Sequence, residues 1–159
     1  MAAPLNELPK LRAVVAAVAG GDFAAEIHAS GYGIVRDGPI LCEAVYPVGD
    51  GERVPLGAKW MKAAVKRARM RLTLDKYLAP LHLHHYEPGT SKSRPEALGF
   101  FLPRRVGSSL VLGKKLATVF ADLILSPDAY ILAREGKLPY RSVEIHDVRT
   151  AEIDSLALM

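Results

Sequence analysis

The chain has 159 residues and a formal net charge of +4, from 21 basic and 17 acidic side chains. Half of the residues are hydrophobic and 24% are charged, which excludes an intrinsically disordered chain, and the length favours one domain. The single cysteine, Cys42, excludes an internal disulfide, so a packed core must supply the stability. No apolar run is long enough to cross a bilayer, and we expect no membrane partner.

The first segment, residues 1–21, is predicted to be an Ala-rich helix that stops at Gly20 and Gly21. Its basic start and apolar middle also fit a secretory signal peptide, but leucines at helical spacing favour the helix. The remainder, residues 22–159, is predicted to form a single domain.

Short extended segments follow this helix, at residues 23–29, 33–36 and 40–46. The pair Asp37-Gly38 between two apolar runs predicts a hairpin, with a loop that Pro39 widens. Apolar residues then recur at helical spacing over 55–72, which predicts an amphipathic helix. This helix is strongly basic; its six basic residues are Lys59, Lys62, Lys66, Arg67, Arg69 and Arg71.

The second half of the chain is predicted to contain mainly strands, joined by one helix. The strands lie at 77–86, 97–102, 110–112, 116–125, 140–148 and 152–158, with Gly113-Lys114 as a turn before the fourth. Ser126 and Pro127 predict the start of a helix that runs to Arg134 and is stopped by Gly136. The pattern therefore predicts an α+β domain with about seven or more strands and about three helices.

The densest group of chemically versatile side chains is the histidine run His82, His84 and His85. In a strand, His85 shares the apolar face with the neighbouring leucines, whereas His82 and His84 share the other face. His85 is therefore either a structural residue of the core or a general base. His82 and His84 could both reach one zinc ion, but no HExxH motif, cysteine pair or carboxylate accompanies them. We expect no metal and no organic cofactor.

A second group of polar side chains lies at residues 138–145, where Ser142 and Glu144 fall on one strand face and Arg141 on the other. A Ser-x-Glu pair of this kind is also common on solvated strands. A serine becomes a nucleophile only when a base removes its proton, so Ser142 gains chemical meaning only if a histidine approaches it.

A family resemblance connects these two groups. Blocks in matching order resemble the tailed-phage prohead maturation proteases of the Mu-like prophage protease and scaffold type, which are distantly similar to the herpesvirus assemblins. These blocks are residues 80–85, 99–101, 105–106, 120–123, 136–145 and 153–158. The resemblance implies a small, closed or partly closed, mostly antiparallel β-barrel of about seven strands flanked by about three helices.

The same resemblance implies a serine endopeptidase of phage or prophage head maturation, which cleaves capsid or scaffold protein, and itself, through an acyl-enzyme. It assigns Ser142 as the nucleophile and His85 as the general base. His84 stands where many relatives have glycine and is the alternative base, although strand alternation favours His85. The third catalytic residue is expected to be Glu144, which could instead pair with a basic side chain. Further candidates for that role are His146, Asp147, Glu152 and Asp154, and candidate oxyanion donors are Arg104, Arg105 and Arg141.

The resemblance also implies partners and a location. The major capsid protein and the scaffold protein are expected as substrates, homo-oligomers can form, and the site of action is the assembling prohead in the bacterial cytoplasm. Because relatives often continue into a scaffold segment after the protease, we expect this chain to be either a protease alone or a trimmed product, with a separate scaffold or capsid partner.

The alternative function is a noncatalytic capsid-assembly or nucleic-acid-binding module that uses the basic helix at 57–70. The charges of that helix are also typical of a solvated helix face. Because interleaved aromatic residues and a nucleic-acid-binding motif are both missing, we favour the solvated face and do not expect nucleic acid as a partner.

Overall fold

The computed structural model describes residues 32–48, 51–75, 77–83, 97–145 and 147–159. The predicted helix at 1–21 and the predicted strand at 23–29 lie outside these residues. The elements in chain order are β1 (Gly33–Cys42), β2 (Ala44–Val48), β3 (Glu52–Leu56), α2 (Ala58–Asp75), β4 (Ala79–Leu83), β5 (Ala97–Val111), β6 (Lys114–Leu125), α3 (Pro127–Arg134), β7 (Arg141–Glu144), the short 3₁₀-helix η3 (Val148–Thr150) and β8 (Ser155–Leu158).

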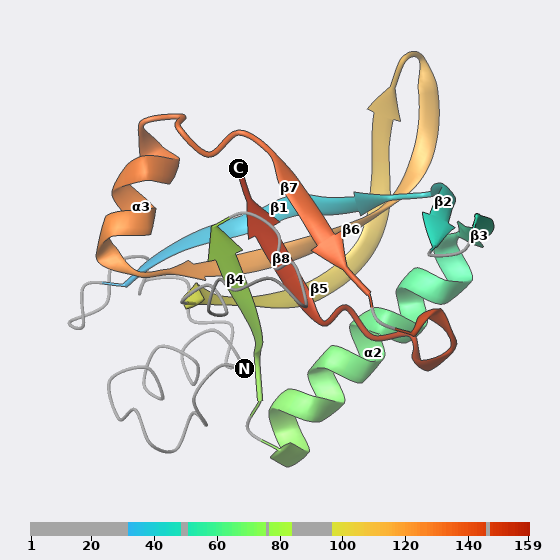
Figure 1. The fold of residues 1–159 in the computed structure, drawn as a ribbon, viewed down its shortest axis with the longest axis horizontal. Coiled ribbons are helices and arrows are strands. Elements are labelled where there is room, and N and C mark those ends of the chain that lie inside the picture. Colours follow the sequence, from blue (N-terminus) through green and yellow to red (C-terminus); the bar gives the residue numbers. More distant parts are fainter. Residues whose placement is uncertain (1–31, 49–50, 76, 84–96, 146) are drawn as a thin grey trace.

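Six of the strands form one curled sheet in the order β1-β6-β5-β4-β8-β7, and β2 and β3 form a separate hairpin (Figure 1). All pairs in the large sheet are antiparallel except β4 and β8, which run parallel. The sheet curls until its two edge strands approach each other, and the Arg141 Nη1 group on β7 donates a hydrogen bond to the Pro39 carbonyl on β1 at 3.1 Å. Because no ladder joins these edges, the sheet is a half-barrel.

The main core lies inside the curl of the sheet and beneath α2. Its fully buried members include Met61 from α2, Phe101 from β5 and Leu156 from β8. Burial of such side chains contributes roughly 1.5–3 kcal/mol each to folding. This packing fixes α2 across the sheet and holds the strands that bear the candidate site.

The predicted α+β class and the mostly antiparallel sheet are confirmed, but the predicted numbers of elements are not matched. The described part of the chain contains eight strands and two α-helices. One reason is that the segments predicted at 97–102 and 110–112 are parts of a single long strand, β5. The turn that follows it is formed by Leu112 and Gly113, both with positive φ, one residue earlier than predicted.

The hairpin predicted at Asp37-Gly38 is wrong, because β1 runs through both residues. Asp37 has a φ of 52°, and the register of β1 against β6 shifts between Val35 and Gly38. The Asp37 N–H donates a hydrogen bond of 3.0 Å to the Oδ1 atom of Asp122, a buried residue on β6. The Asp-Gly pair therefore forms a β-bulge within one strand, held by a distant carboxylate.

Both predicted helices of the described region are confirmed, with shifted bounds for the first. The helix expected at 55–72 is α2, three residues further along at each end, and α3 begins after Ser126 as predicted. Gly136, with a φ of 71°, follows the end of α3. The strands predicted at 140–148 and 152–158 are shorter, because η3 and its neighbours separate β7 from β8.

Candidate active site

Strand β8 lies between β4 and β7 and brings the two predicted site segments into one part of the sheet. Ser142 on β7 is paired with Ala157 on β8, and Ala157 is paired with His82 on β4. Side chains directly opposite each other in a sheet share a face, so Ser142 and His82 lie on the same face, two strand spacings or about 10 Å apart. Ala157 between them carries only a methyl group.

Ser142 lies on an edge strand and is partly exposed. It belongs to the lining of a cavity of about 470 Å³ between β1 and β7, which we call the β1–β7 cavity. Pro39, Cys42 and Tyr46 line the opposite wall. No hydrogen bond joins the Ser142 hydroxyl to any other described residue. This serine can therefore meet an external group.

Glu144 lies two residues beyond Ser142 on the same strand face. Its Oε1 atom accepts a hydrogen bond from the Ser155 hydroxyl on β8 at 2.9 Å, and its backbone carbonyl accepts one from the Asp154 N–H at the same distance. Ser155 is only 8% exposed. The first contact orients the Glu144 carboxylate, and the second holds the backbone of β7 against the segment that leads into β8.

The predicted base, His85, lies outside the described residues, as do its alternative His84 and the candidate orienting residue His146. These assignments stay predictions. His82 is described: it is 3% exposed and faces the same side of the sheet as Ser142. The sequence predicts a role for His82 only as a zinc ligand, because the parallel pairing of β4 with β8 leaves no local signal in either segment.

Two of the other carboxylates considered for the third role are bound to arginines. Asp147 caps η3 and pairs with Arg149, which lowers the pKa of Asp147 through a side-chain hydrogen bond. Glu152 forms ion pairs with Arg67 and Arg71 on α2. Both carboxylates stabilise the segment between β7 and β8. Among the described residues, no group of three or more His, Cys, Asp or Glu side chains could hold a metal ion.

Two of the three candidate oxyanion donors form ion pairs with carboxylates away from Ser142. Arg105 makes a bidentate pair with Asp37, at 2.9 and 2.6 Å, and Arg104 lies 3.5 Å from Asp122. Both arginines stand on β5, which β8 and β4 separate from β7. Arg141 is adjacent to Ser142 and lines the same β1–β7 cavity, although strand alternation directs the two side chains to opposite faces of β7.

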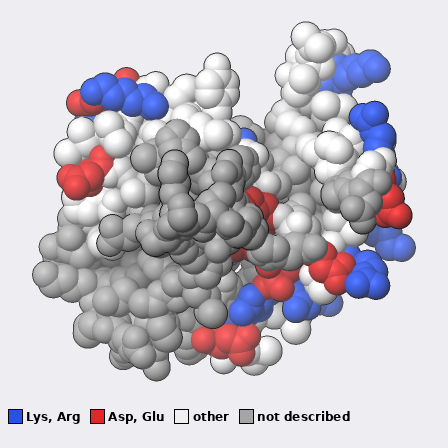
Figure 2. All heavy atoms as spheres, in the orientation of Figure 1, with Lys and Arg blue, Asp and Glu red and all other residues white. Residues whose placement is uncertain are grey.

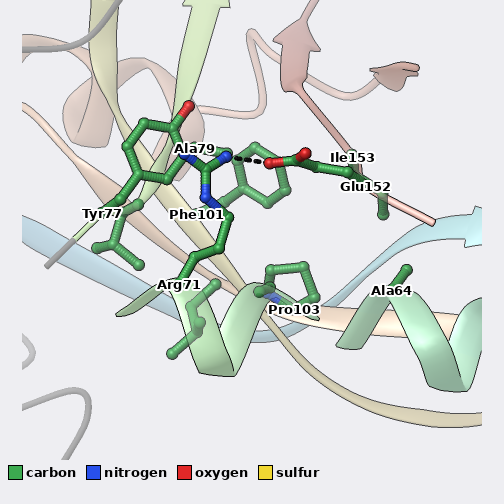
Figure 3. A pocket seen from close by; sticks show the side chains of 11 residues that line it. Ala64, Arg71, Tyr77, Ala79, Phe101, Pro103, Glu152 and Ile153 are labelled. Carbon is green, nitrogen blue, oxygen red and sulfur yellow. Dashed lines mark hydrogen bonds and ion pairs between the residues drawn. The ribbon is translucent and has the colours of Figure 1, made fainter. Parts of the chain in front are cut away.

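Three of the six basic residues of α2 contact other parts of the fold. Arg67 and Arg71 bind Glu152, and the Arg71 guanidinium also stacks 3.9 Å from the centre of the Tyr77 ring (Figure 3). Arg69 donates to the Arg104 carbonyl at 3.0 Å. On the face seen in Figure 2, basic side chains stand beside acidic ones along the edge that α2 occupies. These contacts favour a structural role for the helix.

A scan against protein-family models, a search of curated proteins and a search of solved structures each found no match to this chain. No helix in the described ranges is both long and apolar enough to cross a membrane. The function must therefore be argued from the residues of the chain itself.

Proposed function

We propose that the chain is a serine endopeptidase with Ser142 as its nucleophile. The observation that carries this proposal is the position of Ser142. Its hydroxyl is partly exposed on an edge strand beside a cavity, and a single strand, β8, separates it from β4, which leads into the histidine run. The resemblance of both segments to the prohead maturation proteases supports the same assignment.

The reaction is an acyl transfer in two halves. A histidine removes the Ser142 hydroxyl proton, the oxygen attacks a peptide carbonyl, and the same proton passes to the amine that leaves. Water, deprotonated by that histidine, then attacks the acyl-enzyme. The histidine returns the proton to the Ser142 oxygen as the acyl–oxygen bond breaks and the acid leaves. The oxyanion requires backbone N–H donors, each of which typically contributes about 100–1000-fold in rate.

The base is a member of the histidine run. The resemblance selects His85, whereas the register of β4, β8 and β7 supports His82, since His82 shares the face of Ser142. Glu144, bound by Ser155, orients the imidazole. The half-barrel is compatible with an assemblin-like barrel, and the resemblance points to the capsid and scaffold proteins of a tailed phage as substrates.

Coexpression with the cognate capsid and scaffold proteins tests the proposal. We expect Ser142→Ala to reduce cleavage at least about 1000-fold, because it removes the nucleophile, while Ser108→Ala on the exposed part of β5 leaves it unchanged. Gel electrophoresis with mass spectrometry of the products measures the cleavage. Full cleavage by Ser142→Ala would exclude this serine as the nucleophile.

The same assay identifies the base. His85→Ala and His82→Gln are compared, with thermal unfolding as the check that each variant is folded. Loss of activity in a folded His85→Ala variant, with activity kept in His82→Gln, identifies His85; the reverse result identifies His82. Activity in both folded variants contradicts a base within this pair.

A further inference from the structure

Among the residues that the structure describes, Arg141 forms no ion pair with an acidic side chain. Its Nη1 atom donates a hydrogen bond to the Pro39 carbonyl, and a guanidinium has five N–H donors in all. The side chain is partly buried, and that burial lowers the pKa of Arg141. A partly buried cation is costly unless a carboxylate or several hydrogen bonds compensate it.

Arg141 lies where two cavities meet. It lines the β1–β7 cavity together with Ser142, and it also lines a second cavity of about 340 Å³ beneath α3, which we call the α3 cavity. Volumes of this size are typical of small-ligand sites. The Arg141 side chain therefore borders both cavities.

The walls of the α3 cavity are apolar and basic. Leu123, Leu125 and Leu158 line it, and its charged lining residues are Arg36, Arg134 and Arg141. None of the described residues that line either cavity is acidic. A ligand that places a carboxylate at Arg141 and an apolar portion against the leucines would supply the missing negative charge.

We infer that Arg141 binds a carboxylate of the peptide that Ser142 cleaves, with the apolar walls of the α3 cavity accepting the portion that carries it. This inference rests on the proposed function, since it makes the carboxylate part of the substrate. Arg141 and Ser142 are adjacent, and an extended peptide rises about 3.3 Å per residue, so the carboxylate lies within a few residues of the scissile bond. It comes from an acidic side chain or from the peptide C-terminus.

The test uses hexapeptide libraries on an array, in which each position in turn holds Glu, Gln, Lys or Leu, with either a free or an amidated C-terminus. Binding of labelled Ser142→Ala protein is measured, so the result does not depend on cleavage. At one position, we expect peptides with Glu to bind at least about tenfold more strongly than peptides with Gln, which would identify an acidic side chain as the ligand. Alternatively, peptides with a free C-terminus bind more strongly than amidated ones by that factor, which would identify the terminal carboxylate.

Variants of the site must remove this preference. In the Ser142→Ala background, we expect Arg141→Met to abolish the preference for a carboxylate. The control Arg53→Met changes an exposed arginine of β3 and should leave that preference unchanged. Gly38→Ala is a second variant that leaves the charge in place, because the added Cβ would lie 2.8 Å from Arg141 Nη1 and displace the guanidinium. We expect it to weaken the preference severalfold.

The outcomes separate the two proposals. No preference for a carboxylate, or a preference that persists in a folded Arg141→Met variant, overturns the inference, whatever the cleavage assay shows. A preference that depends on Arg141, together with full cleavage by Ser142→Ala, supports a carboxylate site and rejects Ser142 as the nucleophile.

Discussion

The bulge in β1 depends on individual charged residues. The Asp37 N–H is held by the Asp122 carboxylate, which is 2% exposed, and the Asp37 carboxylate is held by Arg105. The Arg105 guanidinium also lies 4.1 Å from the centre of the Phe120 ring. Residues from β1, β5 and β6 therefore meet at one irregular point, and a change at any of them alters the fit of the others.

This arrangement predicts a pH dependence. The hydrogen bond from Arg105 lowers the pKa of Asp37, so the folded state favours the ionised carboxylate. A lowered pKa adds stability above the ordinary value of about 3.9, and that stability is lost as the pH falls through the lowered folded value. We expect wild type to be more stable than Arg105→Met at pH 7, with a difference that shrinks below about pH 4.

Urea denaturation from pH 2 to pH 7 measures this difference. High salt should reduce it at pH 7, because both partners are about half exposed and their attraction is screened. Arg53→Met is the control and should show no such dependence on pH. A difference between wild type and Arg105→Met that is as large at pH 2 as at pH 7 would rule out Asp37 as its source.

At the scale of elements, the pairing of β5 with β6 depends on the absence of a side chain at Gly99. Gly99 has a φ of 152°, and a Cβ there would lie 1.9 Å from the carbonyl oxygen of Ile124. That oxygen belongs to the backbone of β6 and cannot move without separating the strands. We expect Gly99→Ala to lower the free energy of unfolding by more than about 2 kcal/mol.

Gly57 provides the matched control, because a Cβ at that position meets no atom within 4 Å. Gly57→Ala is expected to change stability by less than about 1 kcal/mol. Chemical denaturation followed by circular dichroism compares the two variants. Equal stability of Gly99→Ala and Gly57→Ala would show that β5 and β6 do not approach as closely as described.

Elements with local signals were predictable from the sequence, and elements that depend on distant residues were not. Helical periodicity predicts α2, and Ser126 with Pro127 predicts the start of α3. The Asp37-Gly38 pair has the local pattern of a turn, but a carboxylate from β6 holds it within a strand. The predicted reversal of the chain is therefore wrong, and the unusual backbone at Asp37 lies within β1 instead.

The candidate site was predictable to the same extent. Strand alternation places Ser142 and Glu144 on one face, and the hydrogen bond from Ser155 to Glu144 follows that arrangement. The position of His82 relative to Ser142 could not be predicted, because it depends on a parallel pair formed between β4 and the last strand. No property of either segment alone specifies that pairing.

At the scale of the whole molecule, β8 connects the two strands, β4 and β7, that carry the proposed site residues. It is the last strand in the chain, yet it lies inside the sheet between β4 and β7. Its pairing with β4 joins residues that are far apart in sequence, which is typical of folds that form slowly. The distance between Ser142 and the histidine strand therefore depends on how well β8 is packed.

Leu156 at the centre of β8 tests this dependence. Its side chain is fully buried, and it pairs with Leu81 on β4 and with Val143 on β7. Leu156→Ala leaves a cavity at that junction, and we expect it to lower the free energy of unfolding by about 2–5 kcal/mol. Leu110 is 77% exposed, so we expect Leu110→Ala to change the free energy of unfolding by less than about 0.5 kcal/mol. Urea denaturation gives both values.

Cleavage by the folded fraction of Leu156→Ala supplies the second measurement. If β8 sets the spacing between Ser142 and the histidine strand, activity per folded molecule falls by more than about tenfold, because a displacement of about 1 Å at a catalytic group can lower the rate about 100-fold. Leu110→Ala should keep full activity. Stability lost without any loss of activity per folded molecule would mean that β8 stabilises the sheet but does not position the site.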